Sequence, residues 1–467
     1  MGPTVSWAPE ALRDRDVAVV GLARSGVAAA SLLLRLGARV VATDTRPASE
    51  LPPAVRALRD RGVRLELGGH RLRTLTGASL VVVSPGVPWD SSPLVEARRA
   101  GVPVVAEIEL GYRCARGRVV AITGTKGKST TAAALGAMLR AADERGDVRV
   151  GGNIGTALCG LVEGATSSTT FVVEVSSFQL EGTESFHPEV ALFLNLETDH
   201  LDRHPTAEAY AAAKARVFRN QTRADWAVVN ADDPAVLALA RAGRGRLLPF
   251  SAGPLAGEGA FFLDGAARIR LDGGEERLFP QDAIRLPGRH LALDLLAAGA
   301  AARVLGAPPE ALARAVEGFA GSDHVLSRIA EHGGVVYYDD SKATNVAAAR
   351  SGLAAFEGPV IPIMGGRSKG GDFRQLREAV ARARVVLLIG EATDEIAGAL
   401  EGAAPVQRCA SMDEAVAAAR ARAQPGDVVL LCPGCASFDM FTDYAERGRA
   451  FQRAVREEIR RSPGGAA

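Results

Sequence analysis

Residues 118–142 limit the possible folds more than any other stretch of the chain. They run from an apolar, β-branched segment, RVVAIT, through the loop GTKGK into a helix-forming segment, STTAAALGAMLRAA. In a strand–loop–helix unit of this kind, main-chain N–H groups and the positive end of the helix converge on phosphate oxygens. The pattern therefore predicts an α/β domain that binds a nucleotide. The alternative is a tight strand–helix turn with Lys128 in solvent.

The loop departs from the most common phosphate-loop pattern. That pattern, G-x-x-x-x-G-K-[ST], would place a glycine at position 122, where this chain has Ile122, and the preceding glycine comes late, at Gly124. Lys128 still stands where it can neutralise the β- and γ-phosphates, and Ser129 or Thr130 can offer a hydroxyl to Mg²⁺. The agreement of strand, turn and helix favours nucleotide binding despite the missing glycine.

Length and composition describe a chain of several globular domains. A chain of 467 residues is too long for one hydrophobic core, and about three domains are expected. Charged residues make up 23% of the chain and the formal net charge is +1, so we expect no nucleic-acid partner. The apolar segments are too short to span a bilayer and no signal peptide is recognisable. We therefore expect no membrane insertion and a cytoplasmic location.

The cysteines give a weak but consistent indication. There are five of them, which is few for this length and odd in number, and this predicts reduced thiols. Cys432 and Cys435 form a C-x-x-C pair, but no second pair exists to complete a zinc site. We interpret this pair as structural rather than redox-active or metal-binding.

The alternation of apolar strands and amphipathic helices predicts an α/β fold class with three domains. An N-terminal Rossmann-like domain is expected over residues 1–107, with the strands DVAVVGL, ARVVATD, LVVVSPG and VPVVAE. A central P-loop-type mononucleotide-binding domain is expected over residues 108–322, and a C-terminal Rossmann-like domain over residues 323–467. In such folds, ligands bind at the carboxyl ends of the strands.

Two local patterns refine this prediction. Residues 260–279, AFFLDGAARIRLDGGEERLF, alternate between apolar and polar side chains and contain Asp-Gly and Gly-Gly pairs. This is typical of antiparallel hairpins, which we expect within the central domain. In the first domain, GVAAASLLLRLG predicts a crossover helix that is closed by Gly37.

Charged side chains stand at the ends of two apolar strands of the central domain. Glu174 ends FVVE, and Asp199 and His200 end VALFLNLETDH. A carboxylate in such a buried position is costly unless it meets a metal or a cation. Glu174 and His200 are therefore candidates to converge on a divalent metal beside the γ-phosphate, and the alternative for His200 is a hydrogen-bonded structural histidine. We expect His204 at the surface.

The first domain carries an incomplete dinucleotide-binding fingerprint. VVGLARSG followed by Asp44 has the outline of G-x-G-x-x-G with an acidic residue about 20 positions later, but Ala23 replaces the middle glycine. A nicotinamide dehydrogenase is the alternative function that this feature suggests. That function would leave the phosphate loop and the metal-binding candidates of the central domain without a role.

A set of motifs along the chain resembles a known family. In order, they are GTKGKST, GGNIG, EVSSFQLE, ETDHLDRH, YAAAKARVF, NADD, DDSKATN and CPGCASFDMF. Together they resemble the Mur ligase family, which builds the peptide stem of the bacterial cell wall, and G-[ST]-x-G-K-[ST] is that family's own form of the phosphate loop. The resemblance covers nearly the whole chain. ATDTRP, VSPGVP, SSFQLE and DSKATN resemble the members that add D-glutamate, rather than alanine or a diamino acid.

The resemblance implies an ATP-dependent amide ligase whose partners are UDP-N-acetylmuramoyl-L-alanine and D-glutamate. ATP phosphorylates the alanine carboxylate, the amine of D-glutamate attacks the acyl phosphate, and a tetrahedral intermediate collapses to amide, ADP and phosphate. Such a reaction demands positioning and charge neutralisation between anions. The implied cofactors are ATP and Mg²⁺, the latter expected as two ions, and a monomer is expected.

The resemblance also implies a set of reacting and metal-binding side chains. Ser129 and Glu174 belong with one Mg²⁺ and His200 with a second. Lys214 matches the family's carbamylated lysine, and carbamylation turns a cation into an anion that attracts metal. Without the family, Lys214 would be interpreted as an exposed helix lysine. The implied catalytic residues are Lys128, Glu174, His200 and Lys214, and the implied metal ligands are Ser129, Glu174, His200 and Lys214.

Three binding sites are implied in the same way. The ATP site comprises Gly124, Thr125, Lys126, Gly127, Lys128, Ser129, Thr130, Asp340 and Lys342. The site for the UDP substrate comprises Ser25, Asp44, Thr45, Arg46, Ser84, Gly86, Asn153 and His200. The D-glutamate site comprises Thr344, Lys369, Ser437 and Phe438. A lysine and two hydroxyls suit a dicarboxylic amino acid, because each desolvated carboxylate needs charge or donors; the alternative for Ser437 is a helix N-cap.

Two segments depart from the family's pattern. The family shows H-N-x-x-N late in the central domain, supplying amides to the adenine, whereas RHLALD keeps His290 but has Leu291 and Asp294. The family's H-R-[FL]-E at the start of the third domain, whose arginine reaches ATP, is HVLS here, with Val325 at the arginine position. Arg328 lies three positions along a strand and so on the opposite face, which argues against simple replacement. We expect an active ligase with an altered nucleotide site.

Two further functions remain open from the sequence. One is another ATP-dependent amide ligase of the Mur or folylpolyglutamate type, acting on a different amino acid or on a folate. The other is a nucleotide-dependent regulatory protein without turnover, which the changes at positions 291, 294 and 325 leave open.

Overall fold

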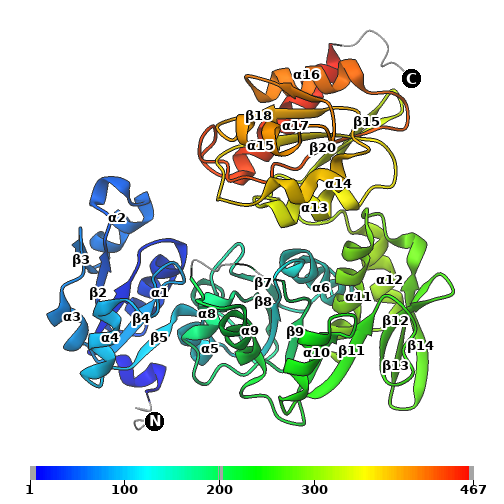
Figure 1. The fold of residues 1–467 in the computed structure, drawn as a ribbon. Coiled ribbons are helices and arrows are strands. Elements are labelled where there is room, and N and C mark those ends of the chain that lie inside the picture. The colour runs from blue at the N-terminus through cyan, green and yellow to red at the C-terminus, as the bar shows by residue number, and fades with distance from the viewer. Residues whose placement is uncertain (1–6, 198, 200–202, 462–467) are drawn as a thin grey trace. The chain divides into compact units, whose positions relative to one another are not determined.

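The computed structural model describes residues 7–197, 199 and 203–461. Over these residues the chain forms three β-sheets in succession, each flanked by helices, and the predicted three-domain α/β class is confirmed (Figure 1). Chain contacts divide the protein into two compact units, Met1–Ala283 with Leu293–Val316, and Ile284–Ala292 with Glu317–Ala467. The first unit holds two of the sheets, so the boundaries at 107/108 and 322/323 remain predictions.

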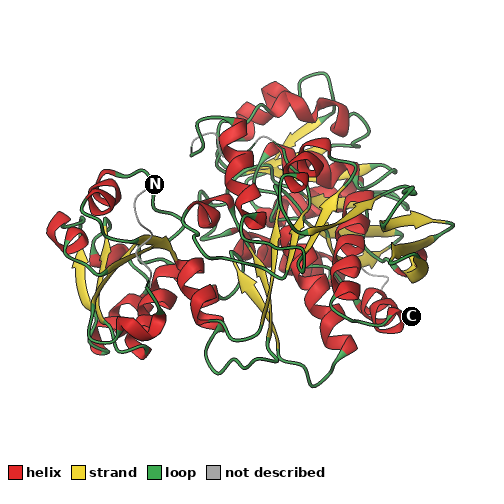
Figure 2. Cartoon of the chain, turned by 90° about the horizontal axis from the view of Figure 1, so that it is seen from below, coloured by secondary structure: helices red, strands yellow, loops and turns green. Residues whose placement is uncertain are grey.

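The N-terminal sheet is parallel, with strand order β3-β2-β1-β4-β5. Val17 and Val19 of β1 face one core and Ala18 and Val20 face another, so the strand is buried on both sides. Helices lie on both sides of these strands (Figure 2), which explains their nearly continuous apolar sequences. The strands are β1 (Asp16–Val20), β2 (Arg39–Asp44), β3 (Arg64–Leu67), β4 (Leu80–Val83) and β5 (Val104–Ala106); the helices are α1 (Arg24–Arg35), α2 (Pro53–Asp60), α3 (Leu72–Thr76) and α4 (Ser92–Arg99).

The predicted crossover helix is α1, and Gly37 closes it as expected. Gly37 has a φ of 81° and its N–H donates to the carbonyl of Leu34, while Ala38 N–H donates to that of Leu33. These bonds satisfy carbonyls at the helix end that have no partner within the helix.

The central sheet has the order β14-β13-β12-β11-β10-β9-β6-β8-β7, so β6 lies between β8 and β9. Strands β6 to β12 pair in parallel. The strands are β6 (Arg118–Thr123), β7 (Val148–Gly152), β8 (Thr170–Glu174), β9 (Val190–Phe193), β10 (Trp226–Asn230), β11 (Arg246–Ser251), β12 (Gly259–Leu263), β13 (Ala266–Leu271) and β14 (Gly274–Pro280). The helices are α5 (Glu107–Cys114), α6 (Lys128–Ala142), α7 (Leu158–Leu161), α8 (Ser177–Glu181), α9 (Ala207–Ala215), α10 (Pro234–Arg241), α11 (Arg289–Val304) and α12 (Pro309–Gly318).

The predicted antiparallel region is formed by β12, β13 and β14. Asp264 and Gly265 connect the first pair of strands with φ values of 49° and 69°, and Asp272 and Gly273 connect the second pair with 50° and 79°. Two consecutive positive φ values define the hairpin turn that Asp-Gly pairs favour. The hairpins are therefore confirmed, with Asp-Gly at both turns.

The C-terminal sheet has the order β15-β16-β20-β17-β18-β19, and only β15 is antiparallel to its neighbour. Buried apolar side chains form a separate core on each face. The strands are β15 (Ser327–His332), β16 (Val335–Asp339), β17 (Val360–Gly365), β18 (Val386–Ile389), β19 (Val406–Arg408) and β20 (Val428–Leu431); the helices are α13 (Val346–Ala354), α14 (Arg377–Val380), α15 (Thr393–Ala399), α16 (Met412–Arg422) and α17 (Tyr444–Arg460). Short 3₁₀ turns occur at Pro9–Leu12, Ala48–Glu50, Arg216–Phe218, Gln281–Ala283 and Phe373–Leu376.

The cysteines and the helices bear on two further predictions. All five cysteines are free thiols. Cys432 and Cys435 are fully buried, and burial raises the pKa of Cys435 to about 12, which supports a structural role for the pair.

None of the helices that the structure describes is long and apolar enough to cross a bilayer.

Candidate active site

The loop between β6 and α6 has the geometry predicted for a phosphate loop. β6 ends at Thr123, and α6 begins at Lys128 directly after Gly127. Gly127 has a left-handed backbone with a φ of 80°, and a Cβ at this position would lie 2.2 Å from Oδ1 of Asp294. Glycine alone satisfies both the backbone conformation and the available space. The first N–H groups of α6 lack partners within the helix, so they can bind an anion.

Asn195, which sequence reasoning did not identify, fixes the conformation of this loop. It follows the end of β9, the strand next to β6. Its Oδ1 accepts hydrogen bonds from the main-chain N–H groups of Thr125 (3.1 Å) and Lys126 (2.8 Å), and its Nδ2 donates to the carbonyl of Lys126 (3.2 Å). The available signal was a polar residue placed just after a buried strand, at the carboxyl edge of the sheet.

Two lysine side chains meet at the carbonyl oxygen of Gly124. Nζ of Lys128 lies 2.9 Å from this oxygen and 2.8 Å from the carbonyl oxygen of Thr125. Nζ of Lys214, from α9, lies 2.7 Å from the same oxygen of Gly124. The structure therefore brings together two of the predicted catalytic residues at the phosphate loop.

Lys214 is buried, so its interpretation as an exposed helix lysine is wrong. Its exposed fraction is 2%, and Nζ lies 4.7 Å from the ring centroid of Tyr210. Burial, and then the positive charge of Lys128, lower the pKa of Lys214 to about 6, although Asp199 and Glu174 act in the opposite direction. α9 consists mostly of alanine, so it can pack closely against a neighbour. The spacing of its residues does not reveal which face of the helix is buried.

Glu174 ends β8 and is buried, as predicted from its place in the sequence. Its Oε2 accepts a hydrogen bond from Oγ of Ser129 (2.6 Å), and its Oε1 accepts one from Nδ2 of Asn153 (2.8 Å). The structure thus brings together Ser129 and Glu174, the two residues predicted to share one Mg²⁺. A carboxylate is an ordinary Mg²⁺ ligand, and a serine hydroxyl at the start of this helix is one in phosphate loops, so these residues fit the ion.

His200, predicted for catalysis, metal binding and substrate binding, lies outside the described residues. In the described part of the chain, no three His, Cys, Asp or Glu side chains converge as a metal site would require. The predicted Mg²⁺ ligands instead combine a hydroxyl, a carboxylate and a lysine with His200, so they do not form a cluster of that kind.

The expectation that His204 lies at the surface is wrong. Its exposed fraction is 3%, and its Nε2 lies 3.0 Å from Oγ of Ser177. The ring stacks on that of Phe178 at 5.5 Å and lies 5.3 Å from the ring of Tyr210. Aromatic packing between α8 and α9 therefore buries this histidine.

Asp294, one of the departures from the family pattern, lies beside the phosphate loop. Its exposed fraction is 6%. Burial raises the pKa of Asp294 to about 8, although the Thr131 hydroxyl and the charge of Lys128 act in the opposite direction. Its Oδ2 has no hydrogen-bond partner among the described residues. An ionised carboxylate is costly in such a place, so Asp294 holds its proton at neutral pH.

A cavity of about 310 Å³ in the N-terminal domain contains most of the residues predicted to bind the UDP substrate. Asp44, Thr45, Arg46, Ser84 and Gly86 line it at the carboxyl ends of β2 and β4. The structure therefore brings these five together, at the edge of the sheet where such folds bind ligands. His70, which sequence reasoning did not identify, also lines this cavity.

Asp44 is held by an array of donors within this cavity. The N–H of Leu22 donates to its Oδ2 (2.7 Å), and the main-chain N–H and Nε of Arg46 donate to its Oδ1 (2.9 and 3.0 Å). Burial opposes ionisation, but the hydrogen bonds of Arg46 and Leu22 lower the pKa of Asp44 to about 2. Asp44 is therefore a fixed anion that orients Arg46.

Two other residues predicted for the UDP substrate lie away from the cavity lining. Ser25 is in the first turn of α1, and Gly26 beside it packs so closely that a Cβ would lie 1.8 Å from the carbonyl oxygen of Gly21. Asn153 is in the central domain beside Glu174, and its carbonyl oxygen accepts a hydrogen bond from Arg24 (2.7 Å). Arg24 therefore links the start of α1 to the loop after β7.

In the C-terminal unit, two of the residues predicted for D-glutamate lie next to each other. Nζ of Lys369 is 3.4 Å from Oγ1 of Thr344. Asp340, predicted for ATP, is buried after β16, and burial raises its pKa well above the ordinary value. Lys342, also predicted for ATP, is half-buried in the same loop.

Ser437 and Phe438 follow β20 in a separate loop. Ser437 is buried, whereas Phe438 is 65% exposed. The alternative of a helix N-cap at Ser437 is wrong, because Asp443 caps α17 and Ser437 opens a turn with Met440.

Arg447, which sequence reasoning did not identify, connects three loops of the C-terminal unit. Its exposed fraction is 1%, and its guanidinium donates to Oγ and the carbonyl of Ser341 (3.0 and 2.9 Å) and to the carbonyls of Cys435 (3.1 Å) and Gly365 (3.4 Å). Burial lowers its pKa to about 10, so it remains a cation. These loops carry Lys342, Thr344, Lys369 and Ser437.

The other departures from the family pattern lie in the C-terminal unit. Leu291 belongs to its apolar core, and Val325 packs against that core. Arg328 is exposed and pairs with Glu331. The effect of these residues on nucleotide binding stays a prediction.

Three family models match the chain. The model of the Mur ligase MurD-like N-terminal domain matches residues 15–106, that of the Mur ligase middle domain residues 122–302, and that of the Mur ligase glutamate ligase domain residues 326–435. Each match contains one of the three sheets or most of it.

Curated relatives match over nearly the whole length. The UDP-N-acetylmuramoylalanine–D-glutamate ligase of Anaeromyxobacter dehalogenans is 46% identical over 467 aligned positions, covering 97% of this chain and 100% of the relative. That of Acidobacterium capsulatum is 44% identical, covering 95% and 96%, respectively. That of Geotalea daltonii is 43% identical, covering 95% and 98%.

Solved structures share the fold at lower sequence identity. A pseudomurein peptide ligase type C from Methanothermus fervidus has a TM-score of 0.59 at 18% identity, covering 96% of this chain and 100% of that one. The UDP-N-acetylmuramate–alanine ligase MurC of Thermotoga maritima has a TM-score of 0.58 at 19% identity, covering 95% and 99%. A MurF ligase from Thermotoga maritima in complex with ADP has a TM-score of 0.59 at 17% identity, covering 97% and 96%.

Proposed function

Because the chain belongs to the Mur ligase family, we propose that it joins D-glutamate to UDP-N-acetylmuramoyl-L-alanine in an ATP-dependent reaction of peptidoglycan synthesis. The relatives that carry this activity in their names resemble the chain along nearly its whole length. The observation that carries the proposal is the convergence of Lys128, Lys214 and the Ser129–Glu174 pair around one phosphate loop. These relatives are all named as D-glutamate ligases, which disfavours an amide ligase with a different amino-acid substrate.

The phosphate loop binds ATP and orients its γ-phosphate. Lys128 now donates to two carbonyls of its own loop, and it exchanges these acceptors for phosphate oxygens when ATP is bound. The main-chain N–H groups at the start of α6 supply further donors. The transfer of the phosphoryl group to the alanine carboxylate then depends on holding two anions close together, which these positive groups allow.

Mg²⁺ would be held by Ser129 and Glu174. When bound, the ion supplies positive charge that stabilises the phosphate oxygens during transfer. Asn153 donates to the other oxygen of Glu174, so the carboxylate is already oriented by the protein. A second ion would involve His200 and a modified Lys214.

Lys214 is a candidate for carbamylation. With a pKa of about 6, the amine is mostly neutral at pH 7, and only a neutral amine reacts with carbon dioxide. The nitrogen forms a bond to the carbon of CO₂, one C–O π bond breaks, and the amine proton passes to solvent. The product is a carbamate anion, which relieves the repulsion between Lys214 and Lys128 and offers oxygens to a metal.

The two other substrates occupy separate parts of the chain. Asp44, Thr45, Arg46, Ser84 and Gly86 bind the uridine diphosphate in the N-terminal cavity, with further contacts from Ser25, Asn153 and His200. D-Glutamate binds at Thr344, Lys369, Ser437 and Phe438, where Lys369 neutralises a carboxylate. Asp340 and Lys342 of the C-terminal unit remain predicted contacts of ATP. The protein acts as a monomer in the cytoplasm, where both nucleotides are available.

The proposal is tested by measuring phosphate release under multiple turnover with the purified full-length chain. Release is expected only when ATP, Mg²⁺, UDP-N-acetylmuramoyl-L-alanine and D-glutamate are all present. L-Alanine or a diamino acid in place of D-glutamate should lower the rate by about 100-fold or more, because the third site would be left with unpaired donors. Equal or faster release with a diamino acid would overturn the assignment of the amino acid, and no release with any of them would overturn the activity.

A further inference from the structure

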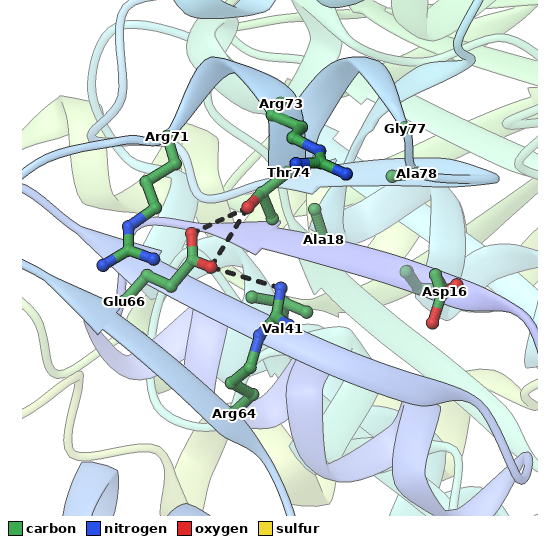
Figure 3. A pocket seen from close by; sticks show the side chains of 11 residues that line it. Asp16, Ala18, Val41, Arg64, Glu66, Arg71, Arg73, Thr74, Gly77 and Ala78 are labelled. Atoms are coloured by element: carbon green, nitrogen blue, oxygen red, sulfur yellow. Dashed lines mark hydrogen bonds and ion pairs between the residues drawn. The ribbon is translucent and has the colours of Figure 1, made fainter.

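The N-terminal domain contains a second cavity at the opposite end of its strands. Its volume is about 430 Å³, and it is lined by residues 16–18 at the start of β1, by β3, and by α3 with the loop before β4 (Figure 3). The cavity proposed for the UDP substrate lies instead where β1, β2 and β4 end, and the two cavities share no lining residue. Nothing in the proposed ligase reaction uses the second cavity.

A buried carboxylate organises the floor of this cavity. The side chain of Glu66 in β3 is only 7% exposed. Oγ1 of Thr74 in α3 lies 2.9 and 3.1 Å from its two carboxylate oxygens, and the guanidinium of Arg64 lies 3.2 Å from Oε1. Glu66 therefore anchors α3 to the sheet through Thr74, and its negative charge is balanced by that of Arg64.

Two further guanidinium groups stand at the cavity without a carboxylate. Figure 3 shows Arg71 and Arg73 on either side of Thr74, with no interaction drawn from either of them. Neither side chain forms a hydrogen bond or an ion pair with any residue that the structure describes. The other acid of the lining, Asp16, is already bound in two places by Arg39, at 2.8 and 3.0 Å. Once Glu66 is paired with Arg64, and Asp16 with Arg39 outside the lining, the two positive charges of Arg71 and Arg73 remain in excess at the cavity.

We propose that this cavity binds a small molecule that carries a phosphate monoester. Two guanidinium forks present paired N–H groups to neighbouring oxygens, which matches a phosphate better than a single carboxylate, and the phosphate charge at pH 7 approaches the excess of two. Ala18, Val41 and Ala78 form an apolar strip beside the arginines, and this strip takes the organic part of the ester. The site is separate from the phosphate loop and does not depend on the proposed ligase function.

The experiment is a calorimetric titration of the full-length protein with phenyl phosphate, in which the ester carries both a dianion and an apolar group. ADP with Mg²⁺ and UDP-N-acetylmuramoyl-L-alanine are present throughout, so that the other phosphate-binding sites are occupied. The Arg71→Ser/Arg73→Ser variant is compared with Arg56→Ser/Arg59→Ser. The second variant removes the same charge from exposed positions of α2, a helix that lines neither cavity.

The wild-type protein and the α2 variant should bind one phenyl phosphate with equal affinity, and the Arg71/Arg73 variant should lose at least tenfold. Inorganic phosphate should bind more weakly than the ester, and malonate more weakly still. All three proteins should have the same thermal unfolding midpoint, because these arginines are exposed. The proposal is overturned by absence of binding to the wild type at millimolar ester, by unchanged affinity in the Arg71/Arg73 variant, or by an equal loss in both variants. Tighter binding of malonate would overturn the assignment to a phosphate.

Discussion

Nζ of Lys214 lies 2.7 Å from the carbonyl oxygen of Gly124. Lys128 donates to the same oxygen at 2.9 Å, so two amino groups share one acceptor and would repel each other if both were protonated. This repulsion is among the causes of the low pKa of Lys214. A change that neutralises or reverses the charge of Lys214 would therefore free Lys128 for phosphate.

Lys214→Ala should lower turnover by about 100-fold or more, because the carbamate proposed for this side chain could not form. Part of the activity should return in formate or acetate, whose carboxylates can occupy the vacated space. Steady-state phosphate release measures both effects. Glu208→Ala, an exposed change in the same helix, serves as the control and should retain activity. Wild-type-like turnover of Lys214→Ala would remove Lys214 from the reaction.

The activity of the wild-type protein should depend on carbon dioxide in a pH-dependent way. With a folded-state pKa of about 6, Lys214 is about 90% neutral at pH 7 and about 10% neutral at pH 5. Incubation in CO₂-free buffer at pH 5 should therefore inactivate the enzyme, and bicarbonate at pH 7.5 should restore it. Assays at a common pH after each incubation make the comparison. Activity that is indifferent to bicarbonate after such treatment would speak against the carbamate.

Asp294→Asn should stabilise the protein increasingly as the pH rises. The folded-state pKa of Asp294 is about 8, above its ordinary value of 3.8, so the folded protein holds a proton that the unfolded chain releases. This contribution to stability is complete below pH 3.8 and is lost as the pH rises toward 8, by at most about 1.4 kcal/mol per pH unit. Asparagine does not titrate. Thermal unfolding midpoints of both proteins at pH 5 and pH 8 should diverge at the higher pH, and parallel midpoints would show that Asp294 is ionised when folded.

The changes at positions 291, 294 and 325 should alter nucleotide selection. The family's amides at the adenine are replaced here by an apolar side chain and a protonated acid, so discrimination between ATP and GTP should be weak. The KM values for the two nucleotides in the complete assay measure this. A protein that binds ATP tightly and rejects GTP would contradict the expectation.

Asn195→Ala should weaken ATP binding by about tenfold or more, because the loop loses the acceptor that orders the N–H groups of Thr125 and Lys126. Calorimetric titration with ATP and Mg²⁺ measures the affinity. Asn220→Ala is a matched control, since this amide also donates to main-chain carbonyls, at Glu184 and Phe186, but away from the loop. If both variants bind ATP equally well, the loop is ordered by other contacts.

Arg447→Met should raise the KM for D-glutamate and reduce the free energy of unfolding by at least about 2 kcal/mol, since it leaves buried carbonyls of Ser341 and Cys435 without a donor. Arg449→Met, an exposed change two residues away in α17, should do neither. Substrate kinetics and denaturant unfolding are the measurements. Destabilisation without any change in the KM would limit Arg447 to a structural role.

The features that depend on residues close together in the chain could be predicted from the sequence. The strand, loop and helix around Gly127, the hairpin turns at Asp264 and Asp272, and the end of α1 at Gly37 each follow from a local pattern of glycine and apolar residues. The buried position of Glu174 was also predictable, because it ends an apolar strand.

Contacts between segments that are distant in the chain could not be predicted from such local patterns. Lys214 reaches Gly124 across 90 positions, and Arg447 reaches Ser341 across 106. His204 is buried by rings from another helix. Periodicity shows that a helix forms but does not say which neighbour covers each face, so these three residues read as ordinary surface or helix positions.

The close approach of Gly127 to Asp294 makes the two positions mutually dependent in any future change of sequence. A methyl group at position 127 collides with the carboxyl group at 294, and the left-handed backbone resists it in addition. Shortening the side chain at 294 removes the first obstacle and leaves the second. Substitution of Gly127 is therefore disfavoured whatever side chain stands at position 294, whereas position 294 can vary as long as the glycine is kept.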